Sequence, residues 1–271
     1  MDQISATGCA IDDSSSLDQQ NDATLVFEGD DPGAVRFGNF INYYSFHPAK
    51  NRIENFPDHI WTVPINYPAT LACLDIGCNT GELTVEMHNL VSQLLLRDEG
   101  SSSPKLRTLG IDVDPVLIKR AQESNSKSES IEFVTADVTS EAAESILQDF
   151  LLRSSTPSFG IVFLMSVTMW IHLVHGDEAL RLLLIRCAQL SNRWLVLEPQ
   201  PWSCYRSAQR RLVRSGASGF PLYSSLAIKG PELLTFMHKV LTEECGFTRI
   251  HQTQPSSWSR TVSFYERNDS K

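Results

Sequence analysis

Short apolar runs alternate with longer amphipathic segments along most of the chain. The apolar runs of strand length are Leu71–Ile76, Leu106–Ile111, Ile131–Thr135, Ile161–Met165 and Trp194–Glu198. Helical spacing of apolar residues fills the gaps, over Glu82–Leu96, Pro115–Ser124, Glu141–Leu152 and Asp177–Leu190. Alternation of this kind builds a parallel sheet with helices packed on its faces. The pattern therefore predicts an α/β fold.

The C-terminal part departs from this alternation. A helical segment over Pro231–Glu244 stops at Gly246, and two strand-like runs follow, Phe247–His251 and Thr261–Tyr265. Two neighbouring runs of this kind pair as an antiparallel edge. The sequence thus predicts one domain over residues 37–267, with a mostly parallel sheet and an antiparallel C-terminal edge.

Charge is distributed unevenly along a chain of ordinary globular composition. Of the 271 residues, 42% are hydrophobic and 20% are charged, and the formal net charge is −9. Residues 1–31 hold eight acidic residues and no lysine or arginine. We expect this segment to be a disordered acidic tail, because it has too few large apolar groups to form a core. The rest of the chain is nearly neutral.

Cysteine spacing and the hydropathy of the chain predict its cellular location. The six cysteines form no close pair and no C-x-x-C motif, which is typical of reduced intracellular thiols. No apolar run approaches the roughly 20 residues of a membrane span, and no apolar signal segment opens the chain. We therefore expect a cytoplasmic protein with no membrane partner.

A glycine loop follows the first predicted strand. Asp75 lies near the end of that strand, and Gly77 and Gly81 flank a short loop before the next helix. Asn79 stands where the dinucleotide pattern G-x-G-x-x-G has its second glycine, so the loop disfavours NAD. An ordinary strand-to-helix turn is the alternative for this loop taken alone.

Acidic residues also close the next two predicted strands. Asp112 follows the second strand, where a carboxylate accepts hydrogen bonds from a ribose diol, and Asp137 follows the third, where it suits an adenine amino group. Carboxyl ends of parallel strands meet at one edge of the sheet, so these acids surround a single ligand. A cofactor with ribose and adenine but no pyrophosphate fits them best.

Three further motifs carry a family resemblance. They are FGNFINYYSFHP at 37–48, FLMSVTMWIHLVHGD at 163–177 and LEPQPW at 197–202. Together with an acid before the glycine loop, which resembles motif I of class I S-adenosylmethionine-dependent methyltransferases, they are similar to the Bicoid-interacting-three domain family. That family contains methylphosphate capping enzymes and RNA 5′-monophosphate methyltransferases. The likeness runs from about Phe37 to Tyr265.

The resemblance implies a Rossmann-like class I methyltransferase with a seven-stranded sheet and S-adenosylmethionine as cofactor. The family's cofactor contacts carry over onto Tyr44, Arg52, Asn79, Asp112, Asp137, Val138 and Met165. The glycine loop adds Asp75, Gly77 and Gly81 to the expected cofactor site. No metal site is predicted, because His172 and His175 have no evident third ligand.

Met169 separates the two branches of the family. The capping enzyme carries a lysine in the segment corresponding to 166–170, and methionine supplies no such charge. The resemblance then implies methylation of the 5′-monophosphate of a small structured RNA, such as a transfer RNA or a microRNA precursor. With its second pKa near ~6, such a phosphate is already largely ionised at neutral pH and needs no general base. Tyr43, His172 and His175 are the expected catalytic hydrogen-bond donors.

A basic segment follows the fifth strand. Residues 199–231 contain no acid, and Arg206, Arg210 and Arg214 recur at helical spacing, as an RNA-binding stripe would. The expected substrate contacts are Glu198, Gln200, Trp202, Arg206, Arg210 and Arg214. The alternatives are a solvated helix face for the arginines, core packing for the aromatic rings and a structural role for at least one histidine.

Two other functions remain open on the sequence. One is a methyltransferase for a protein or small-molecule acceptor. The basic segment 199–231, which contains no acid, argues against this function. The other is an RNA-binding module that binds the cofactor and has lost activity. The preferred hypothesis is a monomeric RNA 5′-monophosphate methyltransferase.

Overall fold

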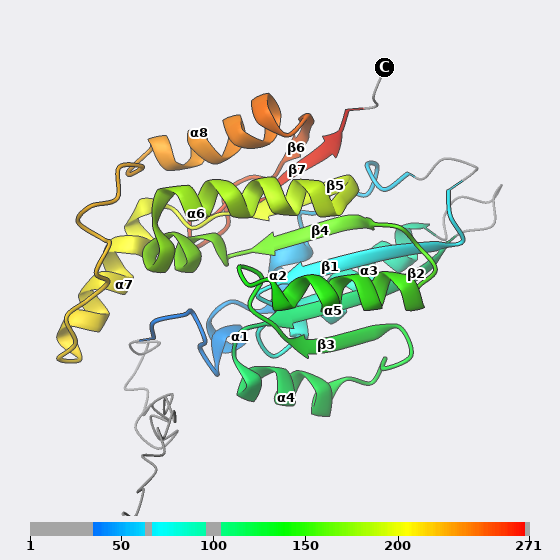
Figure 1. The fold of residues 1–271 in the computed structure, drawn as a ribbon, viewed down its shortest axis with the longest axis horizontal. Coiled ribbons are helices and arrows are strands. Elements are labelled where there is room, and N and C mark those ends of the chain that lie inside the picture. Colours follow the sequence, from blue (N-terminus) through cyan, green and yellow to red (C-terminus); the bar gives the residue numbers. More distant parts are fainter. Residues whose placement is uncertain (1–34, 63–66, 96–103, 269–271) are drawn as a thin grey trace, which may run out of the picture. The chain divides into compact units, whose positions relative to one another are not determined.

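A mixed sheet of seven strands forms the centre of the computed structural model, which describes residues 35–62, 67–95 and 104–268. The strands are β1 (Thr70–Ile76), β2 (Lys105–Asp112), β3 (Ile131–Thr135), β4 (Phe159–Met165), β5 (Ser191–Glu198), β6 (Phe247–Gln252) and β7 (Ser263–Arg267). Their order across the sheet is β3-β2-β1-β4-β5-β7-β6 (Figure 1). Strands β1 to β5 are parallel, and β7 is antiparallel to both of its neighbours. The predicted mostly parallel sheet with an antiparallel C-terminal edge is confirmed.

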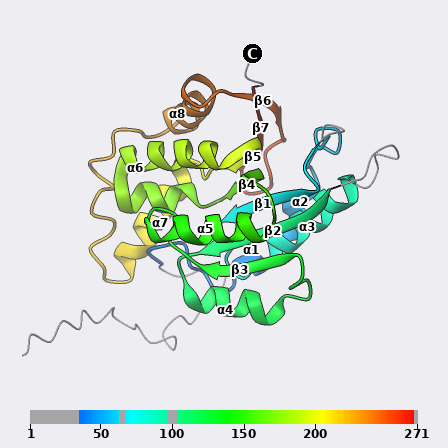
Figure 2. The same cartoon turned by 45° about the vertical axis from the view of Figure 1, so that its right-hand side comes forward.

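Helices lie on both faces of the sheet (Figures 1 and 2). They are α1 (Tyr43–Phe46), α2 (Ala49–Ile53), α3 (Glu82–Leu95), α4 (Pro115–Ser124), α5 (Ala142–Arg153), α6 (Thr168–Leu190), α7 (Trp202–Arg214) and α8 (Glu232–Lys239), which continues into a π-helical turn over Val240–Glu244. In β1, Leu74 and Ile76 pack in the core with α5, α6 and α8, while Leu71 and Cys73 pack in the core with α3. Burial on both faces explains why the central strands β1 and β4 are almost entirely apolar.

Three helices differ from the sequence prediction. Helix α6 begins at Thr168 rather than Asp177, and it contains a kink at Gly176, whose φ is 87°. The predicted helix covered only the part after this kink, because the glycine interrupts the apolar spacing. Helices α1 and α2 were not predicted, since four or five residues are too few to show a helical period.

Two of the predicted segments reach into residues that the structure does not describe. The expected acidic tail, residues 1–31, lies outside the described residues, as does Leu96 at the end of the helix predicted over Glu82–Leu96. The boundaries 37–267 stay a prediction. Among the helices of the described residues, none is long and apolar enough to cross a membrane.

Candidate active site

A cavity of 310 Å³ opens at the carboxyl ends of β1, β2 and β4, where the strand order reverses. In doubly wound sheets this switch point is where ligands bind. Predicted site residues that line it are Tyr43, Tyr44, Arg52, Asp75, Gly77, Asn79, Asp112, Asp137, Val138, Met165 and His175. Gly81 instead lines a second hollow beside Phe133. The fold thus brings most of the expected cofactor residues to one place.

The glycine loop is held in a fixed shape at the floor of this cavity. Gly77 has a φ of +78°, and a Cβ atom there would lie 2.8 Å from Cγ2 of Val167, so neither its conformation nor its surroundings favour a side chain. The backbone N–H of Gly77 donates to the Ile111 carbonyl over 2.8 Å. The side-chain amide of Asn79 donates to the carbonyl of Phe40 over 3.0 Å. The loop therefore connects β1, β2 and the segment before α1.

Asp112 is positioned by the backbone rather than by a cation. Its two carboxylate oxygens accept hydrogen bonds from the N–H groups of Asn79, over 2.9 Å, and Asp114, over 3.0 Å. Burial raises the pKa of Asp112, and these two backbone bonds limit the rise. A carboxylate oxygen has more than one lone pair, so acceptor capacity remains for the hydroxyls of a ribose.

Asp75 presents an unpaired carboxylate oxygen to the cavity. Its Oδ2 accepts a hydrogen bond of 2.6 Å from the Thr84 hydroxyl, while the buried Oδ1 has no partner among the residues that the structure describes. Burial raises the pKa of Asp75 to about 6. A buried oxygen without a donor is costly, and an ammonium group satisfies it best. The methionine amino group of S-adenosylmethionine supplies such a donor, so the cavity fits this cofactor at both its ribose and its amino end.

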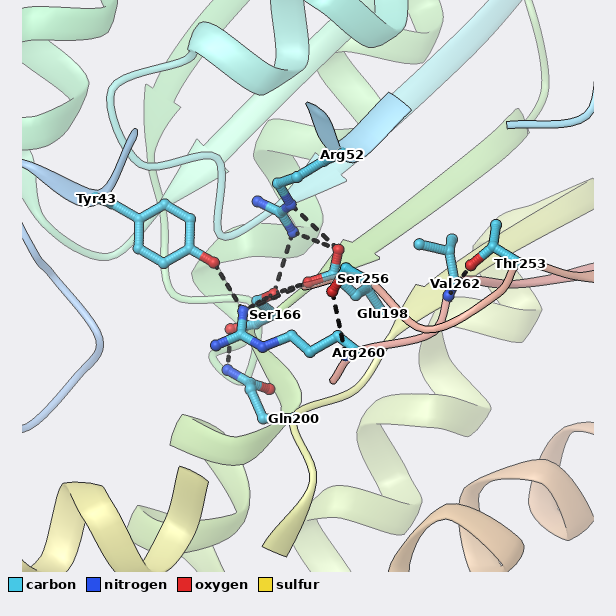
Figure 3. Close-up of polar contacts among 9 residues, drawn as sticks. All are labelled: Tyr43, Arg52, Ser166, Glu198, Gln200, Thr253, Ser256, Arg260 and Val262. Carbon is cyan, nitrogen blue, oxygen red and sulfur yellow. Dashed lines mark hydrogen bonds and ion pairs between the residues drawn. The ribbon is translucent and has the colours of Figure 1, made fainter. Parts of the chain in front are cut away.

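Arg52, Ser166, Glu198 and Arg260 form a charged cluster (Figure 3), of which Arg52 and Ser166 line the cavity. Arg52 pairs with Glu198 over 3.0 Å, and Arg260 lies 3.4 Å from the other carboxylate oxygen. Burial would raise the pKa of Glu198, but the two guanidinium groups outweigh it and hold that pKa below its usual range. Glu198 is therefore ionised, and the cluster carries one net positive charge.

Ser166 joins the members of this cluster. Its hydroxyl accepts from Arg52 over 3.1 Å and from Arg260 over 2.8 Å, and it donates to Glu198 over 2.5 Å. Those three bonds use both lone pairs and the only proton of the hydroxyl. Ser166 directly follows β4 and has a φ of +66°, a conformation that non-glycine residues seldom adopt. The strand end thus sets the position of both arginines.

The two predicted histidines have different surroundings. His172 is fully buried, and its ring nitrogens contact the Tyr205 hydroxyl at 3.1 Å and Asp177 at 2.9 Å. Burial lowers the pKa of His172, against the opposing effect of Asp177. His175 is exposed at the cavity wall. Of the two, His175 alone faces the cavity in the described residues.

The residues predicted to bind substrate lie outside the cavity lining that the described residues form. Glu198 belongs to the charged cluster, and Gln200 is buried, donating to the Ser166 carbonyl and accepting from the Met169 N–H. The Trp202 ring stacks against Tyr223, with centroids 5.5 Å apart. These three side chains are packed or paired within the protein.

The basic stripe, Arg206, Arg210 and Arg214, lies on α7. All three arginines are exposed, in a helix that begins just after β5 and lies beyond the carboxyl end of the central strands (Figure 1). Arg210 donates from Nε to the carbonyl of Arg206 over 3.2 Å. Among the described residues, the stripe is thus an exposed basic surface rather than part of the cavity wall.

Arg260 and Ser166 were not among the site residues predicted from the sequence. Arg260 lies between β6 and β7, and because β7 is antiparallel to β5, with Ser263 paired to Leu197, that loop reaches the carboxyl edge of the sheet. The predicted antiparallel edge did not specify which of the two strands pairs with β5, and that pairing decides where the loop lies. Ser166 stood inside a recognised motif, but its role depends on partners that are distant in the chain.

The sheet order, the cavity at its switch point and the acids that end β1 and β2 define a class I S-adenosylmethionine-dependent methyltransferase. The solved structure of LepI in complex with SAM has a related fold, with a TM-score of 0.50 and 12% identity over 79% of this chain and 47% of that chain.

Comparison of sequences places the chain within this class. The family model of Bicoid-interacting protein 3 matches residues 159–267. The pre-miRNA 5′-monophosphate methyltransferase of Xenopus laevis is 39% identical over 87% of this chain and 94% of its own length. The RNA 5′-monophosphate methyltransferase of Homo sapiens is 36% identical over 86% and 81%. The chain belongs to this family of RNA 5′-monophosphate methyltransferases.

A capping enzyme is also similar, at a lower level. The U6 snRNA methylphosphate capping enzyme Amus of Drosophila melanogaster is 28% identical over 65% of this chain and 56% of its own length. The monophosphate enzymes named above match more of the chain at higher identity, which agrees with Met169 in place of the lysine of the capping branch.

Proposed function

We propose that the protein transfers a methyl group from S-adenosylmethionine to an oxygen of the 5′-terminal monophosphate of small structured RNAs. MicroRNA precursors are the first substrate class, and transfer RNA is a second. The observation that carries the proposal is the 39% identity to a pre-miRNA 5′-monophosphate methyltransferase, which extends over 94% of that enzyme. Free thiols at the five cysteines of the described chain support a location in the cytoplasm. We propose that the enzyme acts as a monomer.

The cofactor supplies a methyl group attached to a positively charged sulfur. Around it, this chain's carboxylates have separate tasks: Asp75 accepts from the amino group, Asp112 from the ribose and Asp137 from the adenine. Val138 and Met165, which are buried at the cavity wall, exclude water from the adenine and the methyl group.

The acceptor phosphate needs orientation more than activation. A terminal phosphate is largely dianionic at neutral pH, so the reaction requires no general base, and positioning lowers most of the barrier. Tyr43 and His175 line the cavity and offer hydrogen-bond donors to the phosphate. Arg52 and Arg260 of the charged cluster contact Tyr43, and the net positive charge of the cluster favours an anion next to the Tyr43 side chain. We assign His172 a structural role, because its two ring nitrogens are already paired.

Removal of the terminal phosphate tests the proposal. Methyl incorporation from labelled S-adenosylmethionine is measured on a microRNA precursor before and after phosphatase treatment. We expect phosphatase to abolish incorporation, because the acceptor oxygen is lost. The activity of a base, ribose or protein methyltransferase does not depend on the 5′-phosphate. Methyl incorporation that persists on the dephosphorylated RNA therefore contradicts the proposal. A triphosphate end should be a poor substrate, since the buried Met169 brings no cation.

A further inference from the structure

The Tyr43 hydroxyl lies between the cavity and an arginine from the other end of the chain. Arg260 donates from Nη1 to the hydroxyl oxygen of Tyr43 over 3.0 Å (Figure 3). A guanidinium has donors only, so the direction of this bond is fixed. The oxygen of Tyr43 accepts from Arg260, and its single proton is left for a different acceptor.

Arg260 is itself held firmly. Its side chain is only 10% exposed, and Nη1 also donates to Ser166 over 2.8 Å. The guanidinium carbon of Arg52 lies 5.6 Å from the centre of the Tyr43 ring. Tyr43 is therefore fixed at its hydroxyl by one arginine and at its ring face by another.

The surroundings of Tyr43 attract an anion. Arg52 and Arg260 outnumber Glu198, which leaves one positive charge next to the cavity. His47, whose ring centroid is 5.2 Å from that of Tyr43, adds none at neutral pH, because burial and the two arginines lower its pKa to about 4. A phosphate oxygen that enters the cavity meets this charge and the free proton of Tyr43.

We infer that Arg260 is a positioning residue that fixes the Tyr43 hydroxyl as the donor to a terminal phosphate oxygen of the RNA. This inference rests on the proposed function. Arg260 is absent from the cavity lining formed by the described residues, so it acts through Tyr43. Without Arg260 the hydroxyl can rotate and donate its proton elsewhere.

A double-mutant cycle on RNA binding tests the inference. The affinities of one microRNA precursor with a 5′-phosphate and with a 5′-hydroxyl are compared in the presence of S-adenosylhomocysteine. The variants are Arg260→Met, Tyr43→Phe and the double variant. The cycle is repeated with Arg260→Lys, which keeps a charge beside Glu198 and so provides a folded protein if Arg260→Met is unstable. Arg249→Met is the matched control, an exposed arginine on β6 next to the same loop.

Each single variant should reduce the preference for the phosphorylated end by about tenfold, the scale of one charge-assisted hydrogen bond. The double variant should lose no more of this preference than the single variant with the larger loss. Arg260→Lys should lose less of the preference than Arg260→Met. Affinities for the 5′-hydroxyl RNA and for S-adenosylhomocysteine should stay within twofold of the wild type, as should all properties of Arg249→Met.

The possible failures point to different conclusions. A wild-type protein without preference for the 5′-phosphate contradicts the proposed function. A wild-type preference that survives in the Arg260 variants overturns the role of Arg260 alone. Losses that add in the double variant also overturn it, because they show that Arg260 does not act through Tyr43.

Discussion

At the scale of single residues, buried polar atoms decide which ligand the site accepts. The hydroxyl of Ser166 has all its hydrogen-bonding capacity used within the protein, so it holds Arg52 and Arg260 in place and has none left for a ligand. Asp75 is the opposite case, with one buried oxygen that has no partner within the described part of the chain. Ser166 therefore stabilises the site, whereas Asp75 needs a hydrogen-bond donor from a ligand.

We predict that Asp75→Asn stabilises the ligand-free protein and weakens cofactor binding. Burial raises the pKa of Asp75 from 3.8 to about 6, so the folded state holds a proton that the unfolded chain releases between these values. Stability is therefore lost as the pH rises through this window, and the penalty is complete above pH 6. Asparagine removes the penalty, which amounts to up to about 3 kcal/mol, and retains an acceptor for Thr84.

Thermal unfolding and calorimetry at several pH values check this prediction. Wild-type affinity for S-adenosylmethionine should rise from pH 5 to pH 7, as the carboxylate that pairs with the amino group forms. In Asp75→Asn it should be weaker and independent of pH in that range. Glu129→Gln is the control, because this acid is exposed and lies outside the cavity lining that the described residues form. A pH-independent wild-type affinity would show that Asp75 does not contact the amino group.

At the scale of elements, the kinked helix α6 is tied to the segment that follows α7. Asp177, next to the kink at Gly176, contacts His172 and also accepts from the backbone N–H groups of Ala227 and Ile228 over 2.8 and 3.0 Å. The His172 ring in turn contacts Tyr205 of α7. One buried histidine thus connects α6, α7 and residues 227–228.

We expect His172→Ala to lower the free energy of unfolding by about 2–4 kcal/mol, through a cavity and unpaired partners. The KM for RNA of the protein that remains folded should not change. His175 lies three residues further along the same helix and is exposed at the cavity. His175→Ala should therefore leave stability unchanged and raise the KM for RNA. Denaturant unfolding and steady-state kinetics measure both. If His172→Ala is as stable as the wild type and has a raised KM for RNA, His172 contacts the substrate and is not structural.

Helix α7 offers a basic face at the same end of the sheet. Replacement of Arg206, Arg210 and Arg214 by glutamine should raise the RNA KM and reduce the slope of log KM against log salt by up to about two units, through lost counterion release. Unfolding temperature and cofactor affinity should be unaffected, since all three side chains are exposed. Lys119→Gln with Arg120→Gln on α4 is the control. An unaltered KM and slope in the α7 variant would place the RNA path on another surface.

At the scale of the whole molecule, segments from the N-terminal and C-terminal parts of the described chain meet beside the cavity. Tyr43 and Arg52 come from the short helices before β1, and Arg260 comes from the loop between the last two strands. The antiparallel pairing of β7 with β5 turns that loop toward the carboxyl ends of the parallel strands. The active site is therefore complete only when the C-terminal edge has joined the sheet.

Deletion of residues 1–34 should leave the fold and cofactor affinity intact and strengthen RNA binding at low salt. The deletion removes eight acids and no base, which changes the formal net charge from −9 to −1 and lessens repulsion of the RNA. Titration of labelled RNA at low and high salt measures the effect, which should vanish at high salt. A full-length variant with the eight acids neutralised to Asn or Gln should match the deletion. Loss of cofactor binding on deletion would show that the segment belongs to the domain.

Local pattern by itself determined the succession of strands and most of the longer helices along the chain, and the acids at the strand ends. Both follow from neighbours in sequence: apolar spacing fixes which face is buried, and a parallel sheet gathers its carboxyl ends at one edge. Asp75, Asn79 and Asp112, named from the sequence as cofactor residues, line one cavity in the structure. The sequence also indicated the family, through motifs of adjacent residues.

Only the tertiary structure decided which polar groups are used inside the protein and which are left for a ligand. Tyr43 and Arg260 are 217 positions apart, and no periodicity relates them. Glu198 was expected to face substrate and instead neutralises Arg52, while His172 is buried between Asp177 and Tyr205. A hydrogen bond depends on distances of about 3 Å between groups whose separation along the chain is arbitrary, so these pairings arise only when the sheet has formed.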